Sequence, residues 1–223
     1  MTSWAVLVAA GRGERLGLDR PKAFAPLRGR ALLAESLERL EGSERIDGIV
    51  VVAPEGWEEP AVLLAEELGC GKVAASVPGG ATRADSVKLG VAEVPEDALV
   101  LLVHDAARPL LSDDVIERVL APLSEGWDGV VPALPLPDTV KRVDDGAVVE
   151  TLAREGLYAV QTPQAFVAAA LREALVGDVS GAGDCASLLE ARWRVKVVEG
   201  DPRLLKVTVT EDLALLDALL GEP

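Results

Sequence analysis

The chain has 223 residues, of which 49% are hydrophobic, and its formal net charge at pH 7 is −15. The hydrophobic content supports a sizeable core and argues against intrinsic disorder. The negative charge disfavours a nucleic-acid backbone as the partner, because phosphate contacts need a basic surface. A small anionic substrate is compatible with this charge only if it binds in a locally basic pocket.

The rare residue types narrow the class of protein. Cys70 and Cys185 are the only cysteines and lack metal-ligand spacing, so we expect free thiols in a reducing cytoplasm. His104 is the only histidine, which excludes a histidine-rich metal site, and the only side-chain amides are those of Gln161 and Gln164. No apolar run reaches the length of a membrane span, and the N-terminus lacks a signal-peptide pattern.

The stretch from residue 5 to residue 22, AVLVAAGRGERLGLDRPK, combines an apolar run with a basic, glycine-rich loop. The run at residues 5–10 predicts a strand buried on both faces. The loop then holds Gly11, Arg12, Gly13, Arg15, Gly17, Arg20 and Lys22. Glycine lets backbone N–H groups approach an anion, and Arg and Lys supply charge-assisted bonds to phosphate. The stretch therefore predicts a polyphosphate site; a tight connection with solvated arginines is the alternative.

Two standard phosphate-binding motifs match this loop poorly. A P-loop needs Gly-Lys-Ser/Thr, but Lys22 follows Pro21 and precedes Ala23. The dinucleotide fingerprint needs a third glycine where Leu16 stands, and no acidic residue ends the second predicted strand. The mismatch argues against a nicotinamide-dependent oxidoreductase.

Apolar runs alternate with amphipathic segments along the first half of the chain. Predicted strands lie at residues 48–53, 72–77, 98–104 and 129–134, and predicted helices at 31–40, 60–68, 82–91 and 113–120. This order predicts an α/β fold with a mostly parallel sheet and helices on both faces. Ligands of such sheets bind beyond the carboxyl ends of the strands, so residues 11–22, 77–85 and 105–109 should converge on one crevice.

The pattern changes after Leu134. Polar alternation around Asp144-Asp145-Gly146 predicts a protruding hairpin with strands at residues 139–143 and 148–153. An isolated hairpin is marginally stable, so we expect it to pack on its own domain or on a second subunit. Further predictions are strands at 158–161, 195–199 and 204–207, and helices at 163–175, 185–191 and 213–220. No linker is evident, so a single domain is the simplest account.

Several polar residues stand where the predicted crevice should be. Asp105 follows a buried strand and is a candidate Mg²⁺ ligand, or else a loop carboxylate. His104 is a candidate base, but a histidine that ends a buried strand is more often packed. Gly79 and Gly80 would let a flat base approach, with Ser86 as a hydrogen-bonding partner. Thr82 and Asp85 alternatively form only a helix cap, and the two interpretations are compatible.

Seven blocks taken together resemble the 2-C-methyl-D-erythritol 4-phosphate cytidylyltransferase family of the non-mevalonate isoprenoid pathway. They are AAGRGERLGLDRPK, PGGATRADSV, VHDAARP, DTVKR, REGLYAVQTPQAF, GDCAS and VEGDPRLLKVTVTEDL, and they span almost the whole chain. The glycine loop alone marks only the broader nucleotidyltransferase superfamily. The resemblance implies a Rossmann-like, glycosyltransferase-A-like nucleotidyltransferase domain over residues 1–223, with a hairpin arm at about residues 136–156 used for homodimerisation.

The resemblance also implies a reaction and a set of residues. Family members transfer CMP from CTP to the sugar-alcohol phosphate with Mg²⁺ and release pyrophosphate. The matching catalytic residues are Arg15, Lys22 and Lys206, and Asp105 matches the magnesium-linked carboxylate. Nucleotide-binding matches are Ala9, Ala10, Gly11, Gly80, Arg83 and Ser86. Matches that grip the second substrate are Arg108, Thr139, Arg154 and Thr162, of which Arg108 and Thr139 are expected to serve the neighbouring subunit's site.

One departure and two rival functions remain. The family often has Thr-Asp-Glu-Ala-Ser where this chain has Gly-Asp-Cys-Ala-Ser, so a substrate-contacting hydroxyl is missing at Gly183. The nearest rival enzyme is a ribitol-5-phosphate cytidylyltransferase, and the distant rival is a non-catalytic nucleotide-binding module. A phosphate acceptor is already ionised near neutrality, so the reaction needs no strong general base, in keeping with a single histidine.

Overall fold

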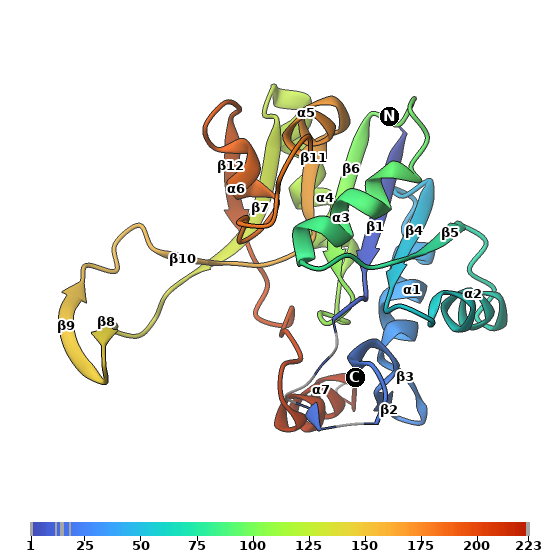
Figure 1. Cartoon of the computed structure of the whole chain (residues 1–223), viewed down its shortest axis with the longest axis horizontal. Coiled ribbons are helices and arrows are strands. Elements are labelled where there is room, and N and C mark those ends of the chain that lie inside the picture. Colours follow the sequence, from blue (N-terminus) through green and yellow to red (C-terminus); the bar gives the residue numbers. More distant parts are fainter. Residues whose placement is uncertain (1, 12, 14–15, 18, 222–223) are drawn as a thin grey trace.

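The computed structural model of the chain describes residues 2–11, 13, 16–17 and 19–221. At its centre lies an eight-stranded sheet with the order β10-β7-β11-β6-β1-β4-β5, and β12 lies beside β7 (Figure 1). Its strands are β1 (Ser3–Val8), β4 (Gly48–Ala53), β5 (Val73–Pro78), β6 (Val100–Asp105), β7 (Gly129–Pro135), β10 (Tyr158–Val160), β11 (Gln164–Val167) and β12 (Val195–Glu199). The strands β6, β1, β4 and β5 run parallel to one another.

The remaining strands give the sheet its mixed edge. β11 is antiparallel to both β6 and β7, β10 is antiparallel to β7, and β12 is parallel to β7. The predicted α/β fold with a mostly parallel sheet is therefore confirmed.

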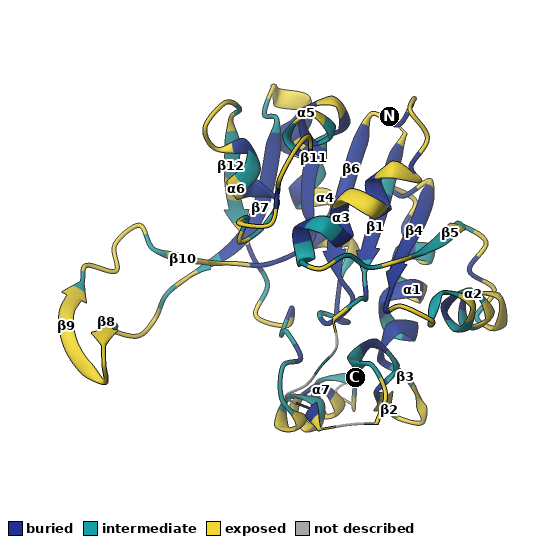
Figure 2. Ribbon diagram, viewed as in Figure 1, coloured by how far each residue is buried: buried dark blue, intermediate teal, exposed yellow. Residues whose placement is uncertain are grey.

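Helices cover both faces of the sheet, because successive side chains of a buried strand point to opposite sides. Leu7 and Val51 pack with α1 (Leu32–Gly42), α2 (Glu58–Glu67) and α4 (Asp113–Leu120). Val6 and Val50 pack with α3 (Arg83–Ala92), α5 (Ala168–Ala174) and α6 (Ala186–Leu189). Figure 2 shows β4 and β6 buried along their whole length and β1 buried along most of it, as expected for strands covered on both faces.

A third, smaller apolar cluster lies beyond the carboxyl ends of β1 and β4 (Figure 1). It joins α7 (Thr210–Gly221) to the short hairpin β2 (Pro26–Leu27) and β3 (Arg30–Ala31) through Leu27, Val207 and Leu216. Two 3-10 turns, η2 (Lys22–Phe24) and η3 (Ala121–Glu125), complete the described elements. None of the described helices has the length and apolar character needed to cross a membrane.

The hairpin β8 (Val140–Asp144) and β9 (Ala147–Leu152) extends away from the sheet as a separate two-stranded ribbon (Figure 1). Asp145 and Gly146 both have positive φ, 42° and 77°, which matches the twist of a tight hairpin turn. Almost all of its residues are exposed (Figure 2). The predicted protruding hairpin is confirmed, and it does not pack on its own domain.

Two predicted elements are wrong. Residues 163–175 are not one helix: Gln164–Val167 forms β11, and only Ala168–Ala174 is helical. Phe166 is fully buried between β6 and β7, and these neighbours override the helical pattern of the apolar run. Residues 204–207 are not a strand, since their backbone is held by Ala107 and by the side chain of Arg108 instead of by a sheet.

Candidate active site

A cavity of about 540 Å³ lies at the carboxyl ends of β1, β5 and β6. Its lining includes residues 8–11 after β1, residues 80–83 after β5, and residues 105–107 at the end of β6. Lys22 and Lys206 also reach it from segments distant in the sequence. The predicted convergence of the three loops on one crevice is therefore confirmed.

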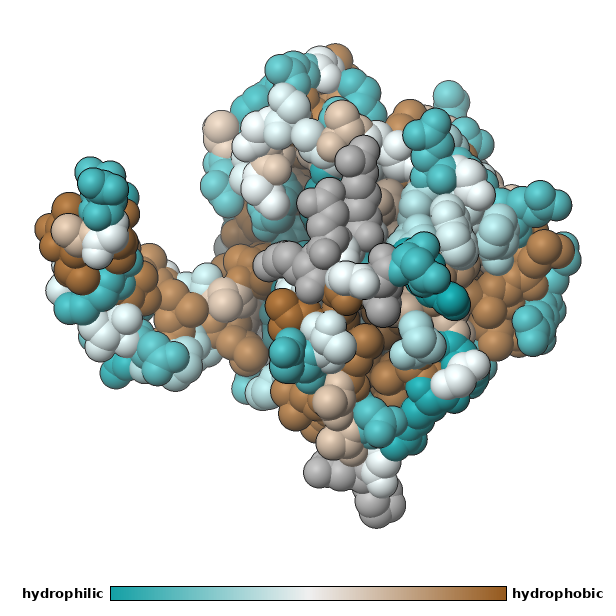
Figure 3. All heavy atoms as spheres, turned by 60° about the horizontal axis from the view of Figure 1, so that its bottom comes forward, coloured by the Kyte–Doolittle hydropathy of each residue, from teal (hydrophilic) through white to brown (hydrophobic). Residues whose placement is uncertain are grey.

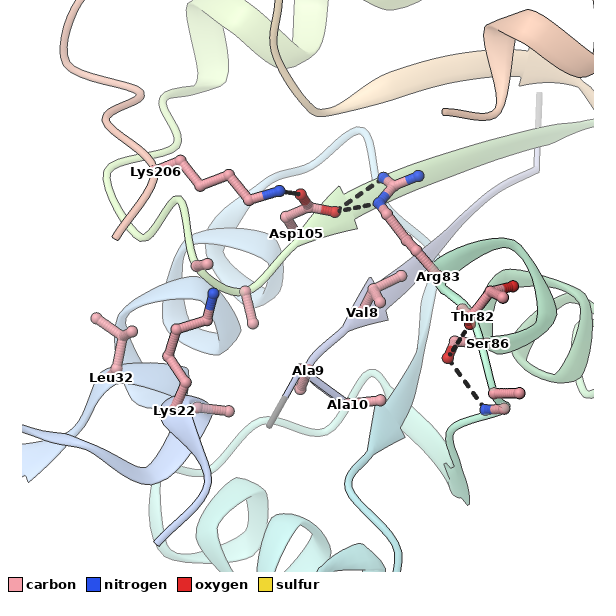
Figure 4. Close-up of a pocket in the computed structure, with 16 residues that line it drawn as sticks. Val8, Ala9, Ala10, Lys22, Leu32, Thr82, Arg83, Ser86, Asp105 and Lys206 are labelled. Atoms are coloured by element: carbon pink, nitrogen blue, oxygen red, sulfur yellow. Dashed lines mark hydrogen bonds and ion pairs between the residues drawn. The ribbon is translucent and has the colours of Figure 1, made fainter. Parts of the chain in front are cut away.

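Asp105, the last residue of β6, is the carboxylate that two cations of this cavity contact. Arg83 contacts its Oδ1 from Nε at 2.9 Å and Nη2 at 2.8 Å, and Lys206 Nζ lies 2.6 Å from its Oδ2 (Figure 4). Burial alone raises the pKa of the Asp105 carboxyl, but the charges of Arg83 and Lys206 outweigh it and hold the pKa well below its usual range. Asp105 is therefore ionised at neutral pH.

Lys22 also points into this cavity, from the side opposite Thr82 and Ser86 (Figure 4). It opens η2 directly after Pro21, and its Nζ donates a hydrogen bond to the carbonyl of Val207 at 3.2 Å. A Cβ at Gly13 would lie 2.6 Å from Cβ of Lys22, and Gly13 has a φ of +68°. Only glycine therefore lets the loop fold closely against Lys22.

The loop after β5 is held by its own hydrogen bonds. Thr82 and Asp85 form a complete capping box at the start of α3, which confirms the predicted helix cap. Ser86 Oγ accepts a hydrogen bond from Gly80 N at 3.0 Å and donates one to the carbonyl of Thr82 at 2.9 Å. A Cβ at Gly79 would lie 2.2 Å from Cβ of Ala10, so this loop packs directly against the end of β1.

The labelled side chains surround an open space in Figure 4, with Ala9 and Ala10 between the basic side and the Thr82–Ser86 side. The amino groups of Lys22 and Lys206 and the guanidinium of Arg83 are three cations that line one cavity, and two of them contact the Asp105 carboxylate. Such a site can bind a polyanion and stabilise charge that develops on it.

His104 is a packed residue, as predicted. It is fully buried; its Nε2 lies 3.1 Å from the Arg108 carbonyl and its Nδ1 lies 3.2 Å from Thr162 Oγ1. Because a carbonyl only accepts, Nε2 carries the hydrogen and Nδ1 accepts from Thr162. Burial lowers the pKa of His104 to about 4. The ring is therefore neutral and already engaged at both nitrogens.

The four residues expected to grip the second substrate do not line this cavity. The Thr162 hydroxyl accepts from Asp105 N at 3.0 Å as well as meeting His104, so it fixes the end of β6. Arg108 donates from Nη1 to the Leu204 carbonyl at 2.6 Å. Thr139 and Arg154 are exposed at the base of the β8–β9 hairpin, where Arg154 bonds to the Pro137 carbonyl. The described cavity thus brings together residues expected to contact the nucleotide, and none of the four expected to grip the second substrate.

Two further predictions concern Arg15 and Gly183. Arg15 lies outside the described residues. Gly183 is exposed, and a Cβ there would meet no atom within 4 Å among the described residues. Asp184 beside it accepts a hydrogen bond from Gln164 Nε2 at 2.7 Å, so this loop is held without a side chain at position 183.

The sequence pattern did not indicate the roles of the two glutamines or the direct contact of Arg83 with Asp105. Gln161 and Gln164 are both buried; Gln161 holds the loop at Asp201, and Gln164 holds the loop at Asp184 and Cys185. Their rarity in the composition was the only available signal, because burial and contacts across 20 to 40 residues leave no local pattern.

The donor set at Asp105 agrees with a metal ion that arrives on a nucleotide. The described residues contain no cluster of three or more His, Cys, Asp or Glu side chains able to hold a metal. Mg²⁺ commonly uses one or two carboxylates together with substrate phosphates and water, and Asp105 supplies one such carboxylate beside a phosphate-sized space.

Comparison with known proteins identifies the family. The family model described as IspD, 2-C-methyl-D-erythritol 4-phosphate cytidylyltransferase, matches residues 3–222. The protein of that name from Saccharopolyspora erythraea is 44% identical over 226 residues, covering 99% of this chain and 100% of the relative. The chain belongs to the 2-C-methyl-D-erythritol 4-phosphate cytidylyltransferase family.

Solved structures agree with this family of cytidylyltransferases. The Thermus thermophilus 2-C-methyl-D-erythritol 4-phosphate cytidylyltransferase is 33% identical with a TM-score of 0.78, covering 97% of this chain and 98% of that one. The 4-diphosphocytidyl-2C-methyl-D-erythritol synthase of Anaerococcus prevotii is 27% identical with a TM-score of 0.84, covering 99% of each chain. The cytidylyltransferase fold therefore extends over essentially the whole chain.

Proposed function

We propose that this chain transfers CMP from CTP to the phosphate of 2-C-methyl-D-erythritol 4-phosphate and releases pyrophosphate. The observation that carries the proposal is the basic cavity around Asp105, in a chain that belongs to the cytidylyltransferase family over residues 3–222. An otherwise acidic chain, with a net charge of −15, concentrates Lys22, Arg83 and Lys206 at this one place.

The chemistry needs positioning and charge stabilisation. An oxygen of the acceptor phosphate attacks the α-phosphorus of CTP, a new P–O bond forms, and the bond to the pyrophosphate oxygen breaks. The attacking oxygen is already ionised near neutrality, so no proton has to be removed. His104, buried and engaged at both ring nitrogens, supplies no general base, in agreement with this scheme.

We give each group a proposed role, and the role of Arg15 rests on the family resemblance alone. Lys22 and Lys206, with Arg15, bind the triphosphate and stabilise the charge on the α-phosphorus and the leaving group. Backbone groups of Ala9, Ala10 and Gly11 contact the nucleotide. Gly80 and Ser86 face the base, and Arg83 fixes the Asp105 carboxylate beside the phosphates.

Magnesium is the proposed cofactor. It would be held by Asp105 and the nucleotide phosphates, and it supplies neutralisation of phosphate charge when bound. Arg83 and Lys206 already contact the two carboxylate oxygens, so an ion held there would share Asp105 with them or take the place of one of them. Lys206, whose side chain is 40% exposed, is better placed to move than Arg83, at 24%.

A homodimer that brings the β8–β9 hairpin against a second chain is proposed for the acceptor side. Val143, Val148 and Val149 on the hairpin are 56%, 61% and 56% exposed, and apolar atoms are visible on the arm in Figure 3. Such apolar surface on a protruding ribbon favours burial against a partner. Thr139 and Arg154 at its base, together with Arg108, would then grip the acceptor at the neighbouring site.

Buried free thiols agree with the reducing cytoplasm expected from the sequence.

Pyrophosphate release tests the proposal. The purified protein with Mg²⁺ is offered CTP, UTP, ATP or GTP, each with 2-C-methyl-D-erythritol 4-phosphate or with ribitol 5-phosphate. We expect release with CTP and the methylerythritol phosphate. Faster release with ribitol 5-phosphate would replace the acceptor, and no release with any pair would leave a non-catalytic nucleotide-binding module.

A further inference from the structure

The only two glutamines of the chain flank Thr162 and Pro163 and are both buried, with exposures of 6% for Gln161 and 1% for Gln164. Gln161 makes a two-way contact with the backbone of Asp201. Its Nε2 donates to the Asp201 carbonyl at 2.8 Å, and its Oε1 accepts from Asp201 N at 2.9 Å. A single amide thus satisfies both backbone groups of one loop residue.

The approach of Gln161 to this loop depends on Gly200. A Cβ at Gly200 would lie 2.3 Å from Oε1 of Gln161 and 3.1 Å from the carbonyl of Ala133. Gly200 N also donates to that carbonyl at 2.9 Å. Gly200 therefore fixes where the chain leaves the end of β12, and Gln161 holds the next residue, Asp201.

The loop that starts at Gly200 carries Lys206. Residues 201–207 form no helix or strand, so side chains replace the hydrogen bonds of a regular element. The Asp201 carbonyl also accepts from Leu204 N at 2.9 Å, and Val207 N donates to the Ala107 carbonyl at 2.8 Å. Between these anchors Lys206 reaches Asp105 Oδ2 at 2.6 Å.

We infer that Gln161 is a positioning residue that sets the place of the Lys206 ammonium through the backbone of Asp201. Removing the amide leaves Asp201 N without its partner and takes one of the two donors from the Asp201 carbonyl, which loosens the start of the loop. The Lys206 ammonium then occupies its productive position beside the α-phosphate of CTP less often. This deepens the proposed function, because it rests on Lys206 acting in CMP transfer.

Gln164 provides a matched control. It is an equally buried glutamine three residues away, and its amide contacts Asp184 and Cys185 N, in a loop that does not carry Lys206. Gln161→Met and Gln164→Met therefore remove the same chemical group with a similar loss of stability, measured as Tm. Should Gln161→Met fail to fold, Gln161→Glu takes its place, because it keeps an acceptor for Asp201 N.

The first measurement is a double-mutant cycle with Lys206→Ala, using kcat and the KM for CTP. We expect Gln161→Met to lower kcat about tenfold in the wild-type background, as displaced catalytic groups do, with an almost unchanged KM. In the Lys206→Ala background the same change should cost less than about twofold, because the group it positions is gone. An equal loss in both backgrounds, or no loss in the wild type, overturns the inference.

The second measurement does not depend on turnover. Acetylation of Lys206 by a dilute activated ester, followed by mass spectrometry, reports how tightly the ammonium is held against Asp105. We expect labelling about threefold faster in Gln161→Met than in wild type, and unchanged in Gln164→Met. Equal labelling in wild type and Gln161→Met overturns the inference. If labelling is faster in Gln161→Met but the protein forms no product, the positioning of Lys206 by Gln161 is supported and only the proposed function is contradicted.

Discussion

At the scale of single residues, one ionised carboxylate organises the charges of the site. Asp105 is 5% exposed and is contacted by Arg83 on one oxygen and Lys206 on the other. Removing one partner of such a buried group is costly, because the remaining charges lose their compensation. With Lys22 added, the described side of the cavity carries a positive excess that attracts a polyphosphate.

Lys22→Ala tests the electrostatic role of that excess. We expect kcat to fall about a hundredfold, the usual effect of removing one donor that stabilises transition-state charge, while the circular dichroism spectrum is unchanged. Lys196→Ala is the control, since Lys196 pairs with Glu125 on the surface. A Lys22→Ala enzyme with near-normal kcat would contradict the role given to this residue.

His104 makes stability depend on pH in a defined window. Burial lowers its pKa to about 4 from 6.5; the charge of Asp105 raises it, and those of Arg108 and Arg83 lower it. Between these two pH values the unfolded chain binds a proton that the folded chain does not. The stability contributed by this residue is therefore complete above pH 6.5 and is lost as the pH falls towards 4.

Urea unfolding of wild type and His104→Gln between pH 7 and pH 4.5 measures this contribution. The wild type should lose up to about 1.4 kcal/mol more per pH unit than the variant, the value for one proton. The variant keeps a side-chain donor but does not titrate, so it corrects for the carboxylates that protonate in the same range. Parallel pH profiles of the two proteins would refute the assignment.

At the scale of elements, the local sequence pattern predicts the β8–β9 hairpin, whereas contacts between distant segments decide β11 and residues 204–207. Its turn and strands were predictable, because Asp144-Asp145-Gly146 and alternating residues act locally. β11 was not predictable, because Gln164–Val167 becomes a strand only through pairing with β6 and β7. The prediction of a strand at residues 204–207 was wrong for the same reason, because contacts with Ala107 and Arg108 decide the conformation of this segment.

Val148→Glu tests the proposed use of the hairpin. Val148 is 61% exposed in the single chain, so a charge there should leave the monomer's stability nearly unchanged but oppose burial in a dimer. We expect sedimentation equilibrium to show a dimer for wild type and a monomer for Val148→Glu. Leu63→Glu, on α2 and 56% exposed, should remain dimeric. A dimeric Val148→Glu protein would argue against the arm as the interface.

At the scale of the whole molecule, the site is assembled from segments that the parallel sheet brings together. The parallel strands place the ends of β1, β5 and β6 at one edge of the sheet, so the convergence of Lys22, Gly80 and Asp105 on one cavity could be predicted from the sequence. The contacts of Arg83 and Lys206 with Asp105 could not, because they join residues 22 and 101 positions apart. The acceptor side is proposed to include a second chain, which no pattern within one sequence specifies.

The most direct test is a crystal structure of the protein with a cytidine nucleotide and Mg²⁺. The account predicts phosphates between Lys22 and the Lys206–Asp105 pair, the ion on Asp105, and the base against the loop from Gly79 to Ser86. A nucleotide bound with its phosphates away from Lys22, Asp105 and Lys206 would contradict it.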